Sequence, residues 1–96
     1  MHHVHGFQAA EKYLKALLQE LGLVAPRTHD LEDLLDLLLP HDASLGPLRR
    51  NLRSLTPYAV NIRYPGLRAT TRRMQAALRH AERVRQQLRA RLGLPP

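Results

Sequence analysis

Apolar side chains recur at intervals of three and four residues along most of this 96-residue chain, and proline or glycine interrupts each run. That spacing places apolar residues on one face of an α-helix, so it predicts amphipathic helices that pack against one another. The first run contains Phe7, Ala10, Leu14, Leu17, Leu18 and Leu21. It predicts the buried face of a helix that ends near Gly22.

A second helix is predicted after the linker that leads to Thr28, whose hydroxyl would cap the start of the helix. Acidic residues follow at Asp30, Glu32 and Asp33. Negative charge in the first turns suits the helix dipole. The buried face of this helix consists of Leu31, Leu34, Leu35 and Leu38. Pro40 should stop it, because proline has no backbone donor.

The second half of the chain contains three further helical segments in this interpretation. The first has Pro47 in its opening turn and an apolar face made of Leu45, Leu48, Leu52 and Leu55. Thr56 and Pro57 then resemble an N-cap and first helical residue, and they start a short segment that continues to Ile62.

The last predicted helix is long, starting at Thr70 or Thr71 and running to about Leu92. Its core stripe is Met74, Ala77, Leu78, Ala81, Val84, Leu88 and Leu92. Since no strand pattern competes, the sequence predicts an all-α, up-and-down helical bundle of about four to five helices. The bundle forms one domain over residues 1–96, with a flexible stub at 1–6 and a tail at 93–96.

Charge is distributed unevenly between the two halves of the chain. Residues 1–48 carry seven acids and three bases, a net charge of −4, whereas residues 49–96 carry twelve arginines and one acid, a net charge of +11. A basic half of this strength attracts polyanions such as RNA, DNA, nucleotides or an acidic partner surface. The alternative is a solvated arginine-rich helix face.

Several classes of protein are excluded by what the sequence lacks. It contains no cysteine, so neither disulfides nor a thiolate site can be proposed. No apolar run approaches the roughly 20 residues of a membrane-spanning helix, and the N-terminus lacks the order of a signal peptide. We therefore expect a cytoplasmic protein without a membrane partner.

Metal and nucleophile chemistry find little support in the residue pattern. His2, His3 and His5 could bind copper or nickel through the amino terminus, but such a cluster more often reflects an incidental translation start. Ser44 and Ser54 have no identifiable base, and no Gly-rich phosphate loop or H-E-x-x-H pattern occurs. No metal site and no cofactor are predicted.

Three segments in order, FQAAEKYLKALL at 7–18, THDL at 28–31 and RYPG at 63–66, resemble the HEPN family. These are small all-helical prokaryotic proteins often encoded beside a minimal nucleotidyltransferase. The resemblance covers about residues 7–90 and implies a homodimer. Family members normally have a further helix ahead of the QAAEK helix, and only MHHVHG precedes it here. The missing helix would leave part of the core stripe uncovered, which favours an interface.

The resemblance directs attention to Arg63 and Tyr64, which together could hold a nucleotide. A guanidinium offers a planar fork for phosphate, and a tyrosine ring stacks on a base. Alternatively, Arg63 bonds to helix-end carbonyls or an acid, and Tyr64 packs under the turn. The remaining ligand-binding candidates, drawn from the other two motifs, are Lys12, Lys15, His29 and Asp30. The lysines could equally be solvated charges, and His29 a capping or packing residue.

Many HEPN proteins resemble metal-independent endoribonucleases that pair an arginine with a histidine on the last helix, across a dimer. The candidates here are Arg73 and His80, separated by six residues. Seven positions make about two helical turns, so both side chains share one face. His80 would act as general acid or base, and Arg73 would stabilise the charge on the phosphorane. The tighter arginine and histidine motif of toxin members is absent, and an ordinary surface histidine is the alternative.

Three functions remain open at this point. The first is a binding protein for a nucleotide or for a minimal nucleotidyltransferase partner, in some cases within a toxin-antitoxin pair. The second is a ribonuclease toxin that uses Arg73 and His80. The third is a basic helical protein that binds RNA or DNA non-specifically through phosphates, with a steep dependence on salt.

Overall fold

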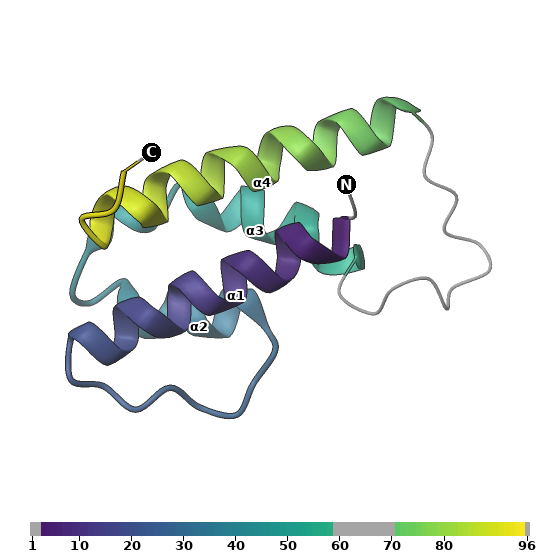
Figure 1. The fold of residues 1–96 in the computed structure, drawn as a ribbon. Helices are drawn as coiled ribbons and strands as arrows, with labels where there is room; N and C mark the ends of the chain where they lie inside the picture. The colour runs from purple at the N-terminus through teal and green to yellow at the C-terminus, as the bar shows by residue number, and fades with distance from the viewer. Residues whose placement is uncertain (1–2, 59–70, 96) are drawn as a thin grey trace.

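The computed structural model describes residues 3–58 and 71–95, and this part of the chain contains helices and no strands. Its elements are α1 (His3–Glu20), α2 (Leu31–Leu38), η1 (Ala43–Leu45), α3 (Leu48–Leu55), η2 (Thr56–Tyr58) and α4 (Thr71–Arg91), where η denotes a 3-10 helix. The long helices α1 and α4 lie side by side, and the shorter α2 and α3 pack against them (Figure 1). The predicted all-α helical bundle is confirmed.

Leucine side chains from all four helices meet in one core. Its buried members are Phe7, Ala10, Leu14, Leu17, Leu18, Leu31, Leu34, Leu35, Leu38, Leu45, Leu48, Leu52, Leu55, Val84 and Leu88. The predicted buried faces of α1, α2 and α3 are therefore largely correct. Within the described residues, none of the helices combines the length and apolar character that crossing a bilayer requires.

Three residues that the apolar repeat places in the core are exposed. Leu21 is 46% exposed because α1 has already ended at Glu20. Met74 and Leu78, on the first half of α4, are 39% and 40% exposed. Leu78 lines an open groove whose α1 side contains the small residues at positions 6, 9 and 10, too short to cover it. The core stripe of α4 therefore begins at Ala77 and continues through Val84 and Leu88.

Glycine ends both long helices in the same way. Gly22 and Gly93 have positive φ angles of 76° and 73°, which side chains with a Cβ adopt only at a cost. The amide of Leu23 donates to the carbonyl of Leu18 at 2.9 Å, and the residue after Gly93 makes the equivalent bond at 2.9 Å. This pattern is the Schellman motif, which satisfies carbonyls left over at a helix end.

The starts of the first two helices differ from the sequence prediction. Helix α1 begins at His3, so residues 3–6, which the prediction left as a stub, form its first turn. Helix α2 is capped by Asp30 rather than by Thr28. The Asp30 carboxylate accepts hydrogen bonds from the amides of Glu32 at 2.9 Å and Asp33 at 3.3 Å. The Thr28 hydroxyl instead accepts from the amide of Asp30 at 3.1 Å.

The third predicted helix is divided in two. Leu45 belongs to the separate 3-10 turn η1, and Pro47 directly precedes α3. Thr56 is both the C-cap of α3 and the first residue of η2, so a short segment does start there, as predicted, but as a 3-10 helix. The Thr56 hydroxyl donates to the carbonyl of Leu52 at 3.2 Å. The predicted continuation to Ile62 lies outside the described residues. The bounds of the last helix agree with the prediction within a residue.

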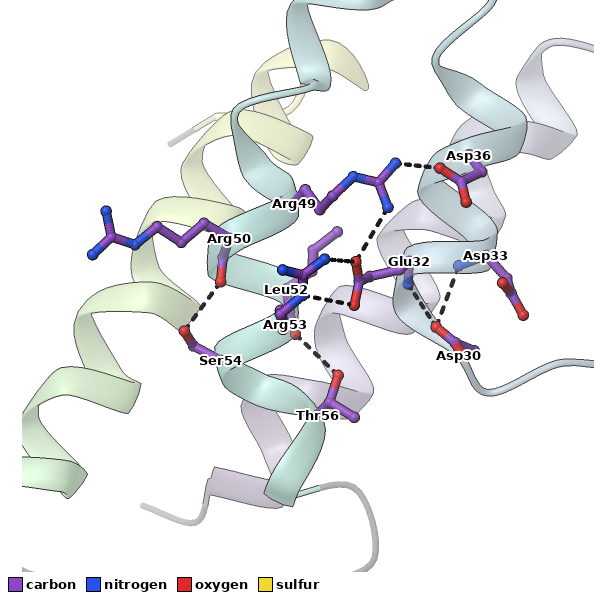
Figure 2. A network of polar contacts seen from close by, with 10 residues as sticks. All are labelled: Asp30, Glu32, Asp33, Asp36, Arg49, Arg50, Leu52, Arg53, Ser54 and Thr56. Atoms are coloured by element: carbon purple, nitrogen blue, oxygen red, sulfur yellow. Dashed lines mark hydrogen bonds and ion pairs between the residues drawn. The ribbon is translucent and has the colours of Figure 1, made fainter.

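Ion pairs join α2 to α3 on the surface (Figure 2). The Glu32 carboxylate accepts hydrogen bonds from Arg49 at 3.1 Å and from Arg53 at 2.9 Å, and Arg49 also pairs with Asp36. The hydrogen bond from Arg53, helped by the one from Arg49, holds the pKa of Glu32 below its usual value. Exposed pairs of this kind contribute little stability individually, so their main effect is to orient two short helices.

A second polar contact joins the loop after α2 to the end of α4. Arg91 donates to the carboxylate of Asp42 at 2.9 Å and to the hydroxyl of Ser44 at 2.8 Å. Hydrogen bonds from Ser44 and then Arg91 lower the pKa of Asp42. Through these two contacts, Arg91 of α4 has a structural role.

Candidate functional site

The QAAEK and THDL segments meet in space although they are separated in sequence. Figure 1 shows the chain between α1 and α2 running back along the bundle before α2 begins. This return brings His29, just before α2, beside Glu11 in the middle of α1. The Nδ1 atom of His29 lies 3.0 Å from one carboxylate oxygen of Glu11, and the ammonium of Lys15 lies 3.0 Å from the same oxygen.

A groove of about 470 Å³ opens at this meeting point, lined by Gln8, Glu11, Lys12 and His29. Helix α1 supplies three of these residues at positions 8, 11 and 12, a spacing that places them on one helix face. The His29 side chain is 83% exposed. Lys12 is exposed too, and its ammonium bonds to no group in residues 3–58 or 71–95.

Glu11 is the electrostatic centre of the groove. Partial burial would raise the pKa of Glu11, but hydrogen bonds from Lys15 and His29 outweigh it and hold the pKa below its usual value. The carboxylate is therefore ionised at neutral pH. A polar ligand in the groove meets an ammonium, an amide, an imidazole and a carboxylate within one small surface.

The structure separates the predicted ligand-binding residues into three groups. Lys12 and His29 line the groove, whereas Lys15 is paired with Glu11 and Asp30 is occupied by capping α2. Arg63 and Tyr64 lie outside the described residues. Gln8 and Glu11 were not singled out from the sequence, although both belong to the QAAEK segment.

His80 is held by a buried polar partner that sequence reasoning missed. The amide nitrogen of Asn51 lies 2.9 Å from Nδ1 of His80, and Asn51 is only 8% exposed. The signal was present, because Asn51 lies between Leu48 and Leu52, on the face of α3 that is otherwise apolar. Partial burial, together with the positive charges of Arg50 and Arg79, lowers the pKa of His80.

Arg73, the predicted companion of His80, is exposed on the first half of α4. The two residues share one helix at a separation of seven positions, so they lie on a common face about two turns apart. The lowered pKa favours the neutral form of His80 at pH 7, in which one ring nitrogen carries a hydrogen and the other a lone pair.

The arginines of the described residues divide into two classes. Those with a partner inside the fold are Arg49, Arg53, Arg73, Arg85, Arg89 and Arg91. Arg27, Arg50, Arg72, Arg79 and Arg83 are exposed, and their guanidiniums bond to nothing in the part of the chain that the structure describes. Only the second class offers guanidinium donors to a ligand without first breaking a contact.

No cluster of three or more His, Asp or Glu side chains that could hold a metal occurs among the described residues. The side chains of His2, His3 and His5 lie outside them. Nothing in the described part of the chain therefore adds a ligand set for a metal ion.

An apolar groove of about 540 Å³ is lined by residues of both α1 and α4. Its floor includes Ala10 and Val84, and Tyr13 and Leu78 line its sides. The two helices approach closely at Gly6 and Ala81. A Cβ added to Gly6 would lie 3.0 Å from the Cβ of Ala81. The groove is a candidate surface for another protein chain.

Comparison with known proteins gives one match. Among curated proteins and solved structures, none is significantly similar to this chain. A family model described as the HEPN domain matches residues 3–91, nearly the whole length. The match includes all four helices, both grooves and the pair formed by Asn51 and His80. On this evidence, the chain belongs to the HEPN domain family.

Proposed function

We propose that this HEPN protein binds a nucleotide in the groove between α1 and the segment before α2. The observation that supports the proposal is the position of Lys12 and His29, which come from two separate motifs and line one groove. Its volume of about 470 Å³ lies within the range of small-molecule sites, about 300 to 1,000 Å³.

The chemistry of the lining residues suits a nucleoside phosphate. Lys12 supplies an ammonium for a phosphate oxygen, and Gln8 supplies an amide that both donates to and accepts from a base edge. Glu11 accepts hydrogen bonds from ribose hydroxyls while it orients His29. Lys15 contributes by holding Glu11 in place.

Isothermal titration of the purified protein with ATP, GTP and AMP tests this proposal. We expect Lys12→Gln to weaken nucleotide binding by about tenfold, the loss of one charge-assisted hydrogen bond. Arg27→Gln is the matched control, since it removes an exposed positive charge that does not line the groove. Equal affinity in the parent protein and Lys12→Gln, or no binding of any of the three nucleotides, contradicts the proposal.

A minimal nucleotidyltransferase is the proposed partner of this protein, and the two would form a toxin-antitoxin pair. The HEPN family supports this proposal, since its members are often encoded beside such an enzyme. A protein that binds a nucleotide and an enzyme that transfers one would also share a ligand. The apolar groove between α1 and α4 supports a homodimer, since Leu78 is 40% exposed beside it. Light scattering should then give a dimer for the parent protein and a monomer for Leu78→Glu.

A ribonuclease that uses Arg73 and His80 is the second candidate, and the hydrogen bond from Asn51 favours it. That bond fixes the imidazole and leaves Nε2–H as a hydrogen-bond donor. In the proposed step, Nε2–H of His80 and the guanidinium of Arg73 stabilise the negative charge that develops on the phosphate oxygens. A water molecule takes the proton of a ribose 2′-hydroxyl, whose oxygen attacks the neighbouring phosphorus. The bond from phosphorus to the 5′-oxygen breaks, and that oxygen receives a proton from water. The products are a cyclic phosphate and a free 5′-hydroxyl.

Cleavage of defined RNAs without metal tests the second candidate. Activity that disappears in both His80→Ala and Arg73→Ala, while both variants stay folded, supports it. Undiminished cleavage in either variant, or none above background in the parent protein, contradicts it.

A further inference from the structure

Two arginines without partners flank the pair formed by Asn51 and His80. Arg50 on α3 and Arg79 on α4 are exposed, and the guanidinium of neither bonds to another group in the described ranges, 3–58 and 71–95. In Figure 2 the side chain of Arg50 extends from the side of α3 opposite the network in which Arg49 contacts Asp36. Each arginine precedes one member of the hydrogen-bonded pair in sequence, and α3 packs directly against α4.

The hydrogen bond fixes the proton on His80. The amide nitrogen of Asn51 carries only hydrogens, so Nδ1 of His80 must be the acceptor in that contact. The proton of the neutral ring is then on Nε2, where it is available as a donor. His80 is partly exposed, so the ring is not sealed from a ligand.

We infer that Arg50, Arg79 and His80 form a phosphate-binding site for a nucleic-acid strand at the junction of α3 and α4. Two guanidiniums provide forked donors that match phosphate oxygens, and Nε2 of His80 adds a neutral donor. Both arginines act electrostatically on His80, since their charges contribute to its lowered pKa. This site does not overlap the nucleotide groove of α1, so it does not depend on the proposed nucleotide binding. It shares His80 with the ribonuclease candidate, and the tests below measure binding rather than cleavage.

A strand is favoured over a single phosphate because the positive charge continues along α4. Arg72, Arg79 and Arg83 are spaced by seven and four residues, which places them in one row on the helix surface. At 1.5 Å per residue the row spans about 16 Å, long enough for several phosphates. All three side chains are exposed, and their guanidiniums bond to no described residue.

The first test is fluorescence anisotropy with a labelled single-stranded RNA and the matching DNA. Arg50→Gln and Arg79→Gln should each weaken binding by about tenfold or more, while Arg27→Gln should change it by less than about twofold. All three variants remove one exposed positive charge, so only position differs. An equal loss of affinity in all three variants would contradict the proposed site. Tighter binding of a polyglutamate peptide than of either nucleic acid would contradict it too.

The second test follows the His80 ring by NMR during pH titration. A phosphate beside the ring favours the imidazolium, so adding RNA should raise the pKa of His80. In the double variant Arg50→Gln, Arg79→Gln, the pKa should start higher and rise less on adding RNA. Inorganic phosphate should have a much weaker effect than RNA at equal phosphate concentration. An unchanged pKa at saturating RNA overturns the inference.

Discussion

The side-chain amide of Asn51 donates a hydrogen bond to Nδ1 of His80 over 2.9 Å, and this contact joins α3 to α4. Asn51 is the one buried polar side chain among the described residues. A buried amide without a hydrogen-bond partner lowers the stability of a protein by about 1 to 3 kcal/mol. The bond to His80 therefore offsets the cost of burying the Asn51 side chain. The contact therefore fixes the position of His80 and the tautomer of its neutral ring.

Replacing Asn51 with aspartate should raise the pKa of His80. A carboxylate at this position accepts a hydrogen bond from the ring and attracts its positive charge, so both effects favour the imidazolium. The measurement is an NMR pH titration of the ring protons. Gln86→Glu, which adds the same charge at an exposed position on α4, should raise the pKa less. A lower pKa in Asn51→Asp contradicts the prediction.

The lowered pKa of His80 should make the protein less stable in mild acid. The folded-state pKa lies below the ordinary value of 6.5, so the unfolded chain binds the proton first as the pH falls. This contribution is fully present above about pH 6.5 and is lost as the pH falls towards the folded-state pKa. Urea unfolding between pH 7.5 and about 5.5 measures the loss. The free energy of unfolding should depend less on pH in His80→Gln than in the parent protein. An identical pH dependence in both proteins would contradict the prediction.

Removing the cap of α2 should destabilise the protein at Asp30 but not at Thr28. Asp30→Ala deprives the amides of Glu32 and Asp33 of their acceptor, at a cost of about 0.5 to 2 kcal/mol. Thr28→Ala removes only the bond to the amide of Asp30 and should cost under about 0.5 kcal/mol. Thermal unfolding followed by circular dichroism compares the two, and a larger loss in Thr28→Ala reverses the assignment of the cap.

Two leucines near the end of α1 should respond differently to truncation. Leu18 is fully buried, so Leu18→Ala should cost about 2 to 5 kcal/mol through lost contacts and a cavity. Leu21 is 46% exposed past the end of the helix, so Leu21→Ala should change the free energy of unfolding by about 0.5 kcal/mol or less. Urea denaturation measures both, and equal losses would place Leu21 in the core.

The candidate sites could be predicted only in part from sequence. Motif resemblance indicated Lys12 and His29, and the structure places both on one groove. It did not indicate Glu11, because a glutamate on a helix is usually a solvated charge. What makes Glu11 central is the return of the chain after α1, which brings His29 to it. A linker carries no periodicity, so its path is decided by tertiary packing.

The apolar repeat predicted the helices and most of the core, and three motifs indicated the family. The spacing of leucines specifies which face of each helix is buried, since burying apolar surface is the main favourable term in folding. Which polar side chains meet, such as Asn51 and His80, and which guanidiniums have no partner, such as that of Arg50, could be seen only in the folded protein. Those outcomes depend on how two helix faces align, and many residues of the same type compete for each contact.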